Sequence, residues 1–135
     1  MTTSPNGQLL ATTSLTRWDR EGSTTSVWRL PGMQPMMEPT LTVADSKMLN
    51  LAFCPLGERL AITMVPAAVA IWDLATGQRT TTLPHLIPPE HISWSADGSR
   101  LVSSDSSATT TIWDVETEQV IATFDGSVAT LSPDG

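Results

Sequence analysis

The stretch Ser95–Phe124, with the sequence SADGSRLVSSDSSATTTIWDVETEQVIATF, decides the fold of this chain. In order, it holds a small-residue turn, an apolar run, a run ending on Trp-Asp, a tight reversal and a further run: Ser95–Gly98, Arg100–Ser104, Thr111–Asp114, Glu116–Glu118 and Val120–Phe124. Aspartate and glycine late in the turn favour a chain reversal, because aspartate bonds nearby backbone and glycine tolerates positive φ. β-Branched residues are frequent in the runs, as is typical of strands. The stretch therefore predicts short antiparallel strands joined by tight turns.

The same order of features occurs twice more toward the N-terminus. The turn recurs at Ser4–Gly7, Cys54–Gly57 and Ser132–Gly135, and the tryptophan endings recur at Ser26–Arg29 and Ala70–Asp73. Further strands are predicted at Gln8–Thr13, Met36–Leu41, Met48–Phe53, Arg59–Met64, Arg79–Leu83, His91–Trp94 and Ser127–Leu131. Self-similarity at a period of about 40 residues is the signature of a repeat architecture. We predict an all-β chain of four-stranded antiparallel units over residues 4–53, 54–94 and 95–131, in one domain spanning 1–135.

The composition favours one folded domain that binds neither nucleic acid nor membrane. The 135 residues are 40% hydrophobic and 16% charged, which is enough apolar content for a core. Fourteen acidic against seven basic residues give a net charge of −7, which repels phosphate backbones and anionic lipid surfaces. The single cysteine, Cys54, offers no internal disulfide, and residues 1–8 show no signal-peptide pattern, so we expect a cytoplasmic protein.

Turn, strand, Trp-Asp ending, reversal and strand together resemble the WD-repeat family of β-propellers. The resemblance covers nearly the whole chain and is strongest over Ser95–Phe124. It implies blades of four antiparallel strands, three of them in this chain. It also implies the role of most members of the family, a protein-interaction module that presents loops at one end of a rigid ring.

The resemblance further implies a hydrogen-bonded network in the last unit. In the family, a Gly-His pair, a serine or threonine, a turn aspartate and the tryptophan stiffen each blade. The matching residues are His85, Ser103, Asp105 and Trp113, with Pro84 where the family has glycine. Asp105 lies farther from Trp113 along the sequence than in the family pattern, so the resemblance implies a loosened network.

Trp28, Trp72 and Trp113 recur at the same place in each unit, and Asp73 and Asp114 complete the Trp-Asp ending in two of them. A large ring with one N–H donor suits the space between stacked sheets, where the donor finds a partner. We therefore predict structural roles for these residues, with packing replacing the network in the first two units.

The strand predicted at Ser127–Leu131 has no sheet of its own to join, and the first unit, which starts at Ser4, lacks an innermost strand. One hypothesis is a head-to-tail homo-oligomer in which this spare strand completes the first blade of the next copy, giving six blades from two copies or nine from three. The alternative is that the chain is a fragment of a larger WD-repeat regulatory protein.

Candidates for catalysis or metal binding are few, and we predict no catalytic, cofactor or metal site. His85, His91 and Glu90 could in principle ligate a metal or exchange protons, but His85 has a better explanation in the network. Cys54 replaces a turn serine of the repeat, which favours a small half-buried residue over a reactive thiol. The sequence shows neither a Gly-x-Ser-x-Gly elbow nor a glycine-rich phosphate loop.

Arg17, Trp18 and Arg20 are the candidate partner contacts. They lie on a long connection, residues 15–24, and Trp18 is out of register with the repeat. Tryptophan and arginine are enriched at interface hot spots, although Trp18 could equally fold back on its own hairpin or pack on a neighbouring copy. A methionine cluster at Met33–Met37 is a weaker candidate, since such residues often cover a sheet edge.

Together these features predict a non-catalytic, cytoplasmic protein-protein interaction scaffold whose partners are itself and an unidentified protein. Two other classes stay open, namely a small-ligand binder or enzyme that uses a central channel, and a purely structural ring.

Overall fold

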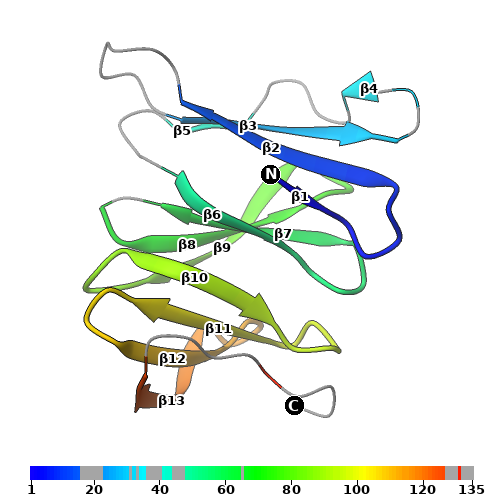
Figure 1. Ribbon diagram of the computed structural model, residues 1–135. Coiled ribbons are helices and arrows are strands. Elements are labelled where there is room, and N and C mark those ends of the chain that lie inside the picture. Colours follow the sequence, from blue (N-terminus) through cyan, green and yellow to red (C-terminus); the bar gives the residue numbers. More distant parts are fainter. Residues whose placement is uncertain are drawn as a thin grey trace.

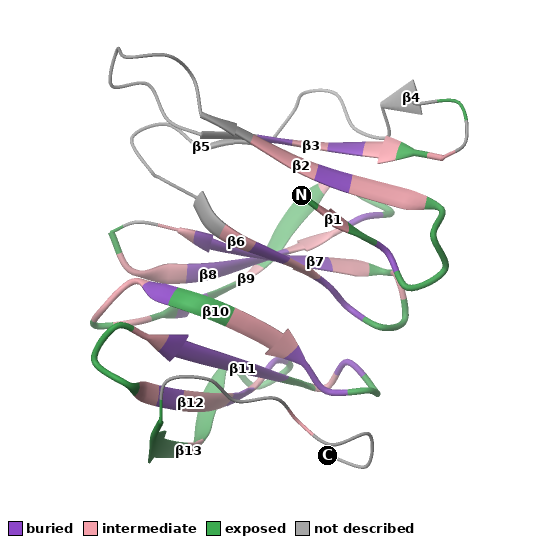
Figure 2. Cartoon of the chain, in the orientation of Figure 1, coloured by how far each residue is buried: buried purple, intermediate pink, exposed green. Residues whose placement is uncertain are grey.

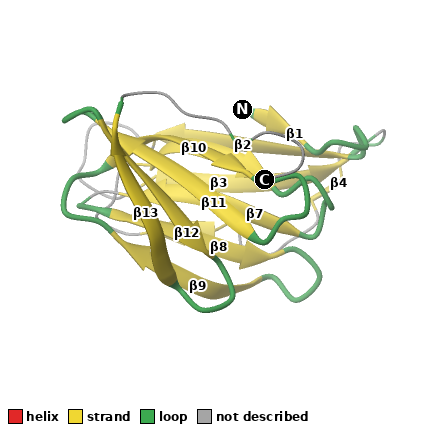
Figure 3. Ribbon diagram, turned by 90° about the horizontal axis from the view of Figure 1, so that it is seen from below, coloured by secondary structure: helices red, strands yellow, loops and turns green. Residues whose placement is uncertain are grey.

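The computed structural model describes residues 1–15, 23–30, 32, 34–35, 41–43, 48–64, 66–126 and 131. Three antiparallel sheets lie one behind the next in chain order (Figure 1), and all described elements are strands joined by loops (Figure 3). The first sheet contains β1 (Thr2–Thr3), β2 (Leu9–Leu15), β3 (Ser23–Arg29), β4 (Gln34–Pro35) and β5 (Leu41–Val43). The second contains β6 (Met48–Phe53), β7 (Arg59–Met64), β8 (Ala68–Asp73) and β9 (Gln78–Pro84). The third contains β10 (Pro89–Trp94), β11 (Arg100–Asp105), β12 (Thr109–Asp114) and β13 (Gln119–Asp125).

The second and third sheets are four-stranded antiparallel meanders, in which each strand pairs with the next one along the chain. This confirms the predicted all-β class and the antiparallel blades. The first two sequence units are offset from the sheets, because the last strand of each pairs with the first strand of the following unit, β6 with β7 and β10 with β11. No helix in the described ranges is long and apolar enough to cross a membrane.

Two apolar clusters hold the sheets together, and Figure 2 shows the burial concentrated along β7, β8 and β11. The cluster between the first two sheets contains Ala11, Val27, Leu51, Phe53, Leu60, Ile62 and Leu74. The cluster between the second and third contains Cys54, Ala61, Val69, Ile71, Leu83, Trp94, Leu101, Trp113 and Val115. Because side chains alternate along a strand, β8 sends Trp72 to the first cluster and Ile71 to the second. The middle sheet therefore packs against an apolar cluster on both faces.

One turn geometry joins the first and second strands of every sheet. In the third sheet the Gly98 amide donates to the Ser95 carbonyl at 3.0 Å, and the Ser95 hydroxyl accepts from the Arg100 amide at 2.9 Å. Ser4 and Gly7 repeat both contacts in the first sheet, with Leu9 as the amide donor. Cys54 keeps the backbone contact alone in the second. The recurrent tetrapeptide is thus a structural repeat, which the sequence predicted.

The expectation that the first sheet lacks an innermost strand is wrong. Thr2 and Thr3 form β1, which pairs with Ala11 and Leu10 of β2, the same register that the innermost strands hold in the other sheets. The prediction started the first unit at Ser4 because two polar threonines carry no apolar strand pattern. A second copy is therefore not needed to supply this part of the strand.

Of the outermost strand predicted for the first unit at Met36–Leu41, only Leu41 is among the described residues. The described residues before and after this segment form two short strands that pair with β3, namely β4 beside Trp28 and Arg29, and β5 beside Ser23–Thr25. Residues 36–40 lie outside the described residues.

Candidate functional site

A chain of hydrogen bonds joins the second sheet to the third at the end of β9. The Trp113 indole N–H donates to the Ser103 hydroxyl at 3.1 Å, and Nε2 of His85 lies 2.7 Å from the same hydroxyl. Nδ1 of His85 lies 2.9 Å from the Leu83 carbonyl oxygen. The His85 and Trp113 rings also contact, with centroids 5.0 Å apart and planes tilted by 46°. The structure thus brings together three of the four residues of the expected network.

The partners of His85 define its proton positions. The Leu83 carbonyl can only accept, so Nδ1 carries a proton, and Nε2 of the neutral ring accepts the Ser103 hydroxyl proton. Burial lowers the pKa of His85, and the Leu83 hydrogen bond and the Asp105 charge oppose this shift. A neutral ring with both nitrogens occupied is a bridge between sheets rather than a free acid, base or ligand.

Asp105 interacts with His85 through its charge, whereas its hydrogen bonds are made within its own turn. Its carboxylate accepts from the Ser107 hydroxyl at 2.6 Å and from the amides of Ser107 and Thr109, so it closes the turn between β11 and β12. Desolvation raises the pKa of Asp105, but the hydrogen bonds from Ser107 and Thr109 together outweigh it, so the pKa of this carboxyl group lies below its ordinary value. These local bonds agree with the loosened network that the resemblance implied.

Asp73 and Asp114 close the reversals that come after the tryptophans. Asp73 accepts from the amides of Ala75 and Thr76 at 2.8 and 2.9 Å, and Asp114 accepts from the Thr117 amide at 2.8 Å. The hydrogen bonds from these turns lower the pKa of both carboxyl groups. Both residues therefore act locally, at the rim between the third and fourth strands of their sheets.

The three tryptophans differ in the partner of the indole N–H. Trp28 donates to the Thr12 hydroxyl at 3.2 Å, as Trp113 does to Ser103. The buried Nε1 of Trp72 has no hydrogen-bond partner in the structure. The strand registers place Ile62 where the other sheets have Thr12 and Ser103. The expectation that every indole finds a partner is therefore wrong for Trp72, because an isoleucine supplies no acceptor.

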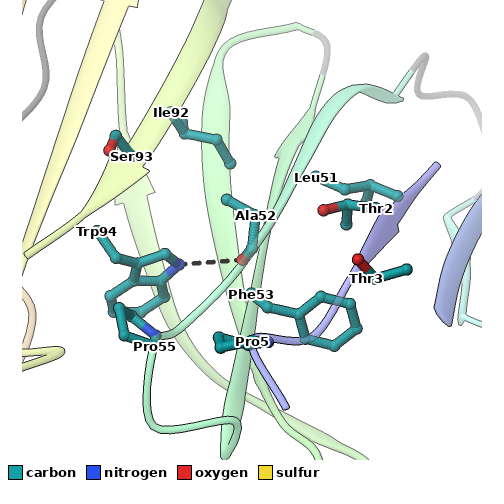
Figure 4. A pocket seen from close by; sticks show the side chains of 10 residues that line it. All are labelled: Thr2, Thr3, Pro5, Leu51, Ala52, Phe53, Pro55, Ile92, Ser93 and Trp94. Carbon is teal, nitrogen blue, oxygen red and sulfur yellow. Dashed lines mark hydrogen bonds between the residues drawn. The ribbon is translucent and has the colours of Figure 1, made fainter. Parts of the chain in front are cut away.

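A cavity of about 310 Å³ opens between the innermost strands of the three sheets (Figure 4). Its lining is uncharged and mixes aromatic rings, prolines and hydroxyls: Thr2, Thr3, Pro5, Leu51, Ala52, Phe53, Pro55, Ile92, Ser93 and Trp94. The indole of Trp94 crosses the seam and donates to the Ala52 carbonyl at 3.0 Å. This cavity can take a small neutral group, with hydroxyls as its side-chain hydrogen-bonding partners.

The remaining polar candidates do not form a reaction centre within the described residues. His91 and Glu90 are exposed on β10, and the described part of the chain holds no group of three His, Cys, Asp or Glu residues that could bind a metal. Cys54 is buried, and burial raises the pKa of its thiol. A raised pKa keeps the thiol protonated and unreactive at neutral pH.

Several sequence candidates lie outside the described residues. These are Arg17, Trp18, Arg20, Met33, Met36, Met37 and the spare strand apart from Leu131. The sequence reasoning missed exposed apolar residues elsewhere: Leu86 on the loop between β9 and β10, and Val120, Ile121 and Phe124 on β13. Comparison of β13 with β9, residue by residue, would have found the second group, because β9 is polar at most of these positions.

The comparisons with known proteins agree with the repeat pattern. No family model matches the chain. Over 96 residues, 67% of the chain, it is 31% identical to WD repeat-containing protein 1 of Mus musculus. The corresponding identities are 35% for the protein of that name from Gallus gallus and 32% for the one from Xenopus tropicalis. The chain spans 16% of the length of these curated relatives.

Proposed function

The chain belongs to the WD-repeat family, and from this premise we propose that it is a non-catalytic protein-interaction scaffold. The support is the way the second and third sheets are cross-linked. Besides the His85–Ser103 contact, Trp94 donates to the Ala52 carbonyl and the Asn50 side chain donates to the Glu90 carbonyl at 3.0 Å. A pair of sheets tied in this way presents its loops with little loss of conformational entropy on binding.

Leu86 is the observation that carries the proposal. Its side chain is fully exposed, yet the loop that holds it is fixed on both sides. His85 is bonded to Leu83 and Ser103 on one side, and Pro89 is buried at the start of β10 on the other. A leucine held in water by a rigid loop is suited to fill a pocket on a partner protein. The connection between β2 and β3 contains Arg17, Trp18 and Arg20 and is a further candidate for the same role.

The test is affinity capture from cell extract with quantitative mass spectrometry, using the wild-type chain and a Leu86→Glu variant. We expect one or more proteins to be enriched by the wild type and reduced at least about five-fold by the variant. Thr82→Glu is the matched control, because Thr82 is exposed on β9 outside the loop. Identical captured sets for all three chains would contradict a role for Leu86.

We also propose that the chain assembles into a closed ring of two or three copies. One argument for this ring is weaker than the sequence suggested, because β1 already supplies part of the innermost strand of the first sheet. The ring is supported by the first sheet, whose Trp28–Thr12 contact repeats the Trp113–Ser103 contact that the third sheet makes beside the second. An absolute mass of two or three chains from light scattering at micromolar concentration would support the ring. The mass of one chain would favour the alternative, a part of a larger WD-repeat protein.

The cavity between the innermost strands favours one second candidate, the binding of a small neutral ligand. Phe53 and Trp94 offer rings for packing, and Thr2, Thr3 and Ser93 offer hydroxyls. A screen of neutral compounds by thermal melting tests this function. A melting shift that Ser93→Val abolishes would support it, and the absence of any shift would remove it.

A further inference from the structure

β13 presents an apolar surface at the outside of the third sheet. It is the last strand in the order β10-β11-β12-β13, so one of its edges pairs with β12 and the other has no strand beside it among the described residues. Val120 is 50% exposed and Ile121 is 49% exposed (Figure 2 shows the strand in the colour of exposed residues). An outer strand with large apolar side chains in water is unusual for a chain that stays soluble alone.

The second sheet shows that a further sheet stacked on the third would not cover these two side chains. The registers match Arg79 and Thr80 of β9 to Val120 and Ile121 of β13, since Arg79 and Val120 each pair with the tryptophan of their sheet. Arg79 and Thr80 are exposed although the second sheet has a neighbour on both faces. Val120 and Ile121 therefore lie at positions that stacking leaves in water.

Phe124 is different and is not part of this surface. It matches Leu83, which is fully buried against the third sheet. The 51% exposure of Phe124 thus belongs to the stacking face of the third sheet.

Among the described residues, the outer edge of β13 lacks the arginine and the proline found on β9, although both strands carry a β-bulge opposite the tryptophan of their sheet. Arginine, lysine and proline on an outer strand discourage the addition of another strand. β9 has Arg79 and ends on Pro84, whereas β13 has Val120 and Asp125 at the matching positions. No described strand pairs with the outer backbone groups of β13, which suits this edge to the addition of an extended chain.

The charges around β13 select the kind of strand that can bind. Exposed Glu116 and Glu118 lie in the turn before β13, and exposed Asp125 ends it. Residues 101–135 contain no lysine or arginine. Antiparallel pairing of two copies of β13 would bring Glu118 of one copy near Asp125 of the other, and like charges oppose this. A segment with basic residues at both ends meets opposite charges instead.

We propose that a partner protein binds at the outer edge of β13 by adding a strand to the third sheet. The added strand is an extended apolar segment of the partner with basic residues on both sides. The inference rests on the proposed scaffold function and names one surface for it. Backbone hydrogen bonds along the edge supply affinity, Val120 and Ile121 contact apolar side chains, and the acidic ends select the basic flanks.

The probe is the capped peptide Lys-Lys-Thr-Val-Thr-Val-Thr-Lys-Lys, titrated into the full chain by isothermal calorimetry. We expect saturable binding with one peptide per chain, weakened as salt is raised because the flanks are charged. Hydrogen–deuterium exchange in the complex should slow for Gln119–Asp125 and stay unchanged for Gln78–Pro84, the matched outer strand.

The variants separate the apolar and charged contributions. Val120→Arg combined with Ile121→Thr gives β13 the residues of β9, so the fold should persist, and we expect at least about ten-fold weaker binding. Glu116→Gln with Glu118→Gln should weaken binding about three-fold and reduce its salt dependence. Arg79→Ala on β9 is the control and should leave affinity unchanged.

Three results would overturn this inference: no binding of the peptide, equal binding after its lysines are replaced by glutamates, or equal binding by the Val120/Ile121 variant. A dimer of the free chain that the same variant dissolves would also overturn it, because the occupant would then be a second copy. The scaffold function fails separately, when extract capture with the wild-type chain enriches no protein. Peptide binding and extract capture can therefore give different answers.

Discussion

The residue that faces the indole of each repeated tryptophan differs among the sheets, and this difference has a measurable energy. Thr12 and Ser103 accept the N–H of Trp28 and Trp113, whereas Ile62 leaves the buried N–H of Trp72 without a partner. A buried donor without a partner costs about 1–3 kcal/mol relative to a bonded one. The isoleucine offsets part of this by packing in the cluster between the first two sheets.

A pair of substitutions at Ile62 isolates the missing hydrogen bond. Ile62→Val should lower the free energy of unfolding by about 1 kcal/mol through lost packing. Ile62→Thr has nearly the same shape as the valine variant but offers an acceptor to Trp72. We expect the threonine variant to be at least as stable as the valine variant in urea unfolding. A threonine variant less stable by more than about 1 kcal/mol would show that its hydroxyl does not reach the indole.

His85 should make stability depend on pH below neutrality. Burial holds the folded pKa below the ordinary value of 6.5, so the unfolded chain takes up a proton first as the pH falls. The contribution of His85 is therefore complete above pH 6.5 and is lost as the pH falls from there through the folded pKa. Urea midpoints between about pH 7.5 and 5 measure this loss. His85→Gln should flatten the profile, and an unchanged slope in that variant would assign the effect to another group.

At the scale of elements, the turn between the first and second strands has room for a side chain at its glycine in the first sheet but not in the third. Gly7 and Gly98 both have positive φ, at 67° and 72°. A Cβ at Gly7 would meet nothing within 4 Å, whereas one at Gly98 would lie 2.6 Å from the Cys54 sulfur. The turn of the third sheet therefore interlocks with the turn of the preceding sheet, and the turn of the first sheet is open.

Alanine substitution should separate backbone strain from this contact. Gly7→Ala should cost about 1–2 kcal/mol, because a Cβ disfavours the left-handed conformation. Gly98→Ala should cost more, since it adds a collision in a close-packed interior. Cys54→Ala should recover part of the extra cost in the Gly98 variant, which urea unfolding of the double-mutant cycle would measure. Equal costs at the two glycines would mean that the turns shift freely past each other.

Strands that consist of an apolar run between turn residues were predictable, and strands whose position depends on a neighbouring strand were not. The bounds of β6 and β7 match the prediction to the residue, because apolar runs and turn residues limit them on both sides. β1 was missed because two threonines carry no periodic signal, and its place comes only from pairing with β2. The contacts among His85, Ser103 and Trp113 were predictable from the family pattern. The missing hydrogen bond of Trp72 was not, because it depends on the register that places Ile62 of β7 beside β8.

At the scale of the whole molecule, the two seams between sheets differ in kind. The seam between the second and third sheets combines an apolar cluster with polar links from Asn50, His85 and Trp94. The seam between the first and second contains the unpartnered N–H of Trp72 within its apolar cluster. Polar links across a packed seam raise the free energy needed to separate the sheets.

Native-state hydrogen exchange should therefore find the second and third sheets opening as one unit. We expect the amides of β7, β8, β11 and β12 to share one high free energy of opening. The amides of β2 and β3 should exchange through an opening of lower free energy. Mass spectrometry of peptic fragments at increasing denaturant measures both. Ser103→Ala should uncouple β11 and β12 from β7 and β8. Equal protection of all six strands would show instead that the three sheets form one cooperative body.

The different surroundings of the indoles also make the chain its own set of spectroscopic reporters. Trp28 bonds a threonine, Trp72 bonds nothing, Trp94 bonds a backbone carbonyl and Trp113 bonds a serine. Their N–H resonances should therefore have different chemical shifts in an NMR spectrum. Each resonance then reports on one sheet or on one seam between sheets. Ligand, peptide or partner binding could then be localised from a few indole signals, without attaching a dye or altering a side chain.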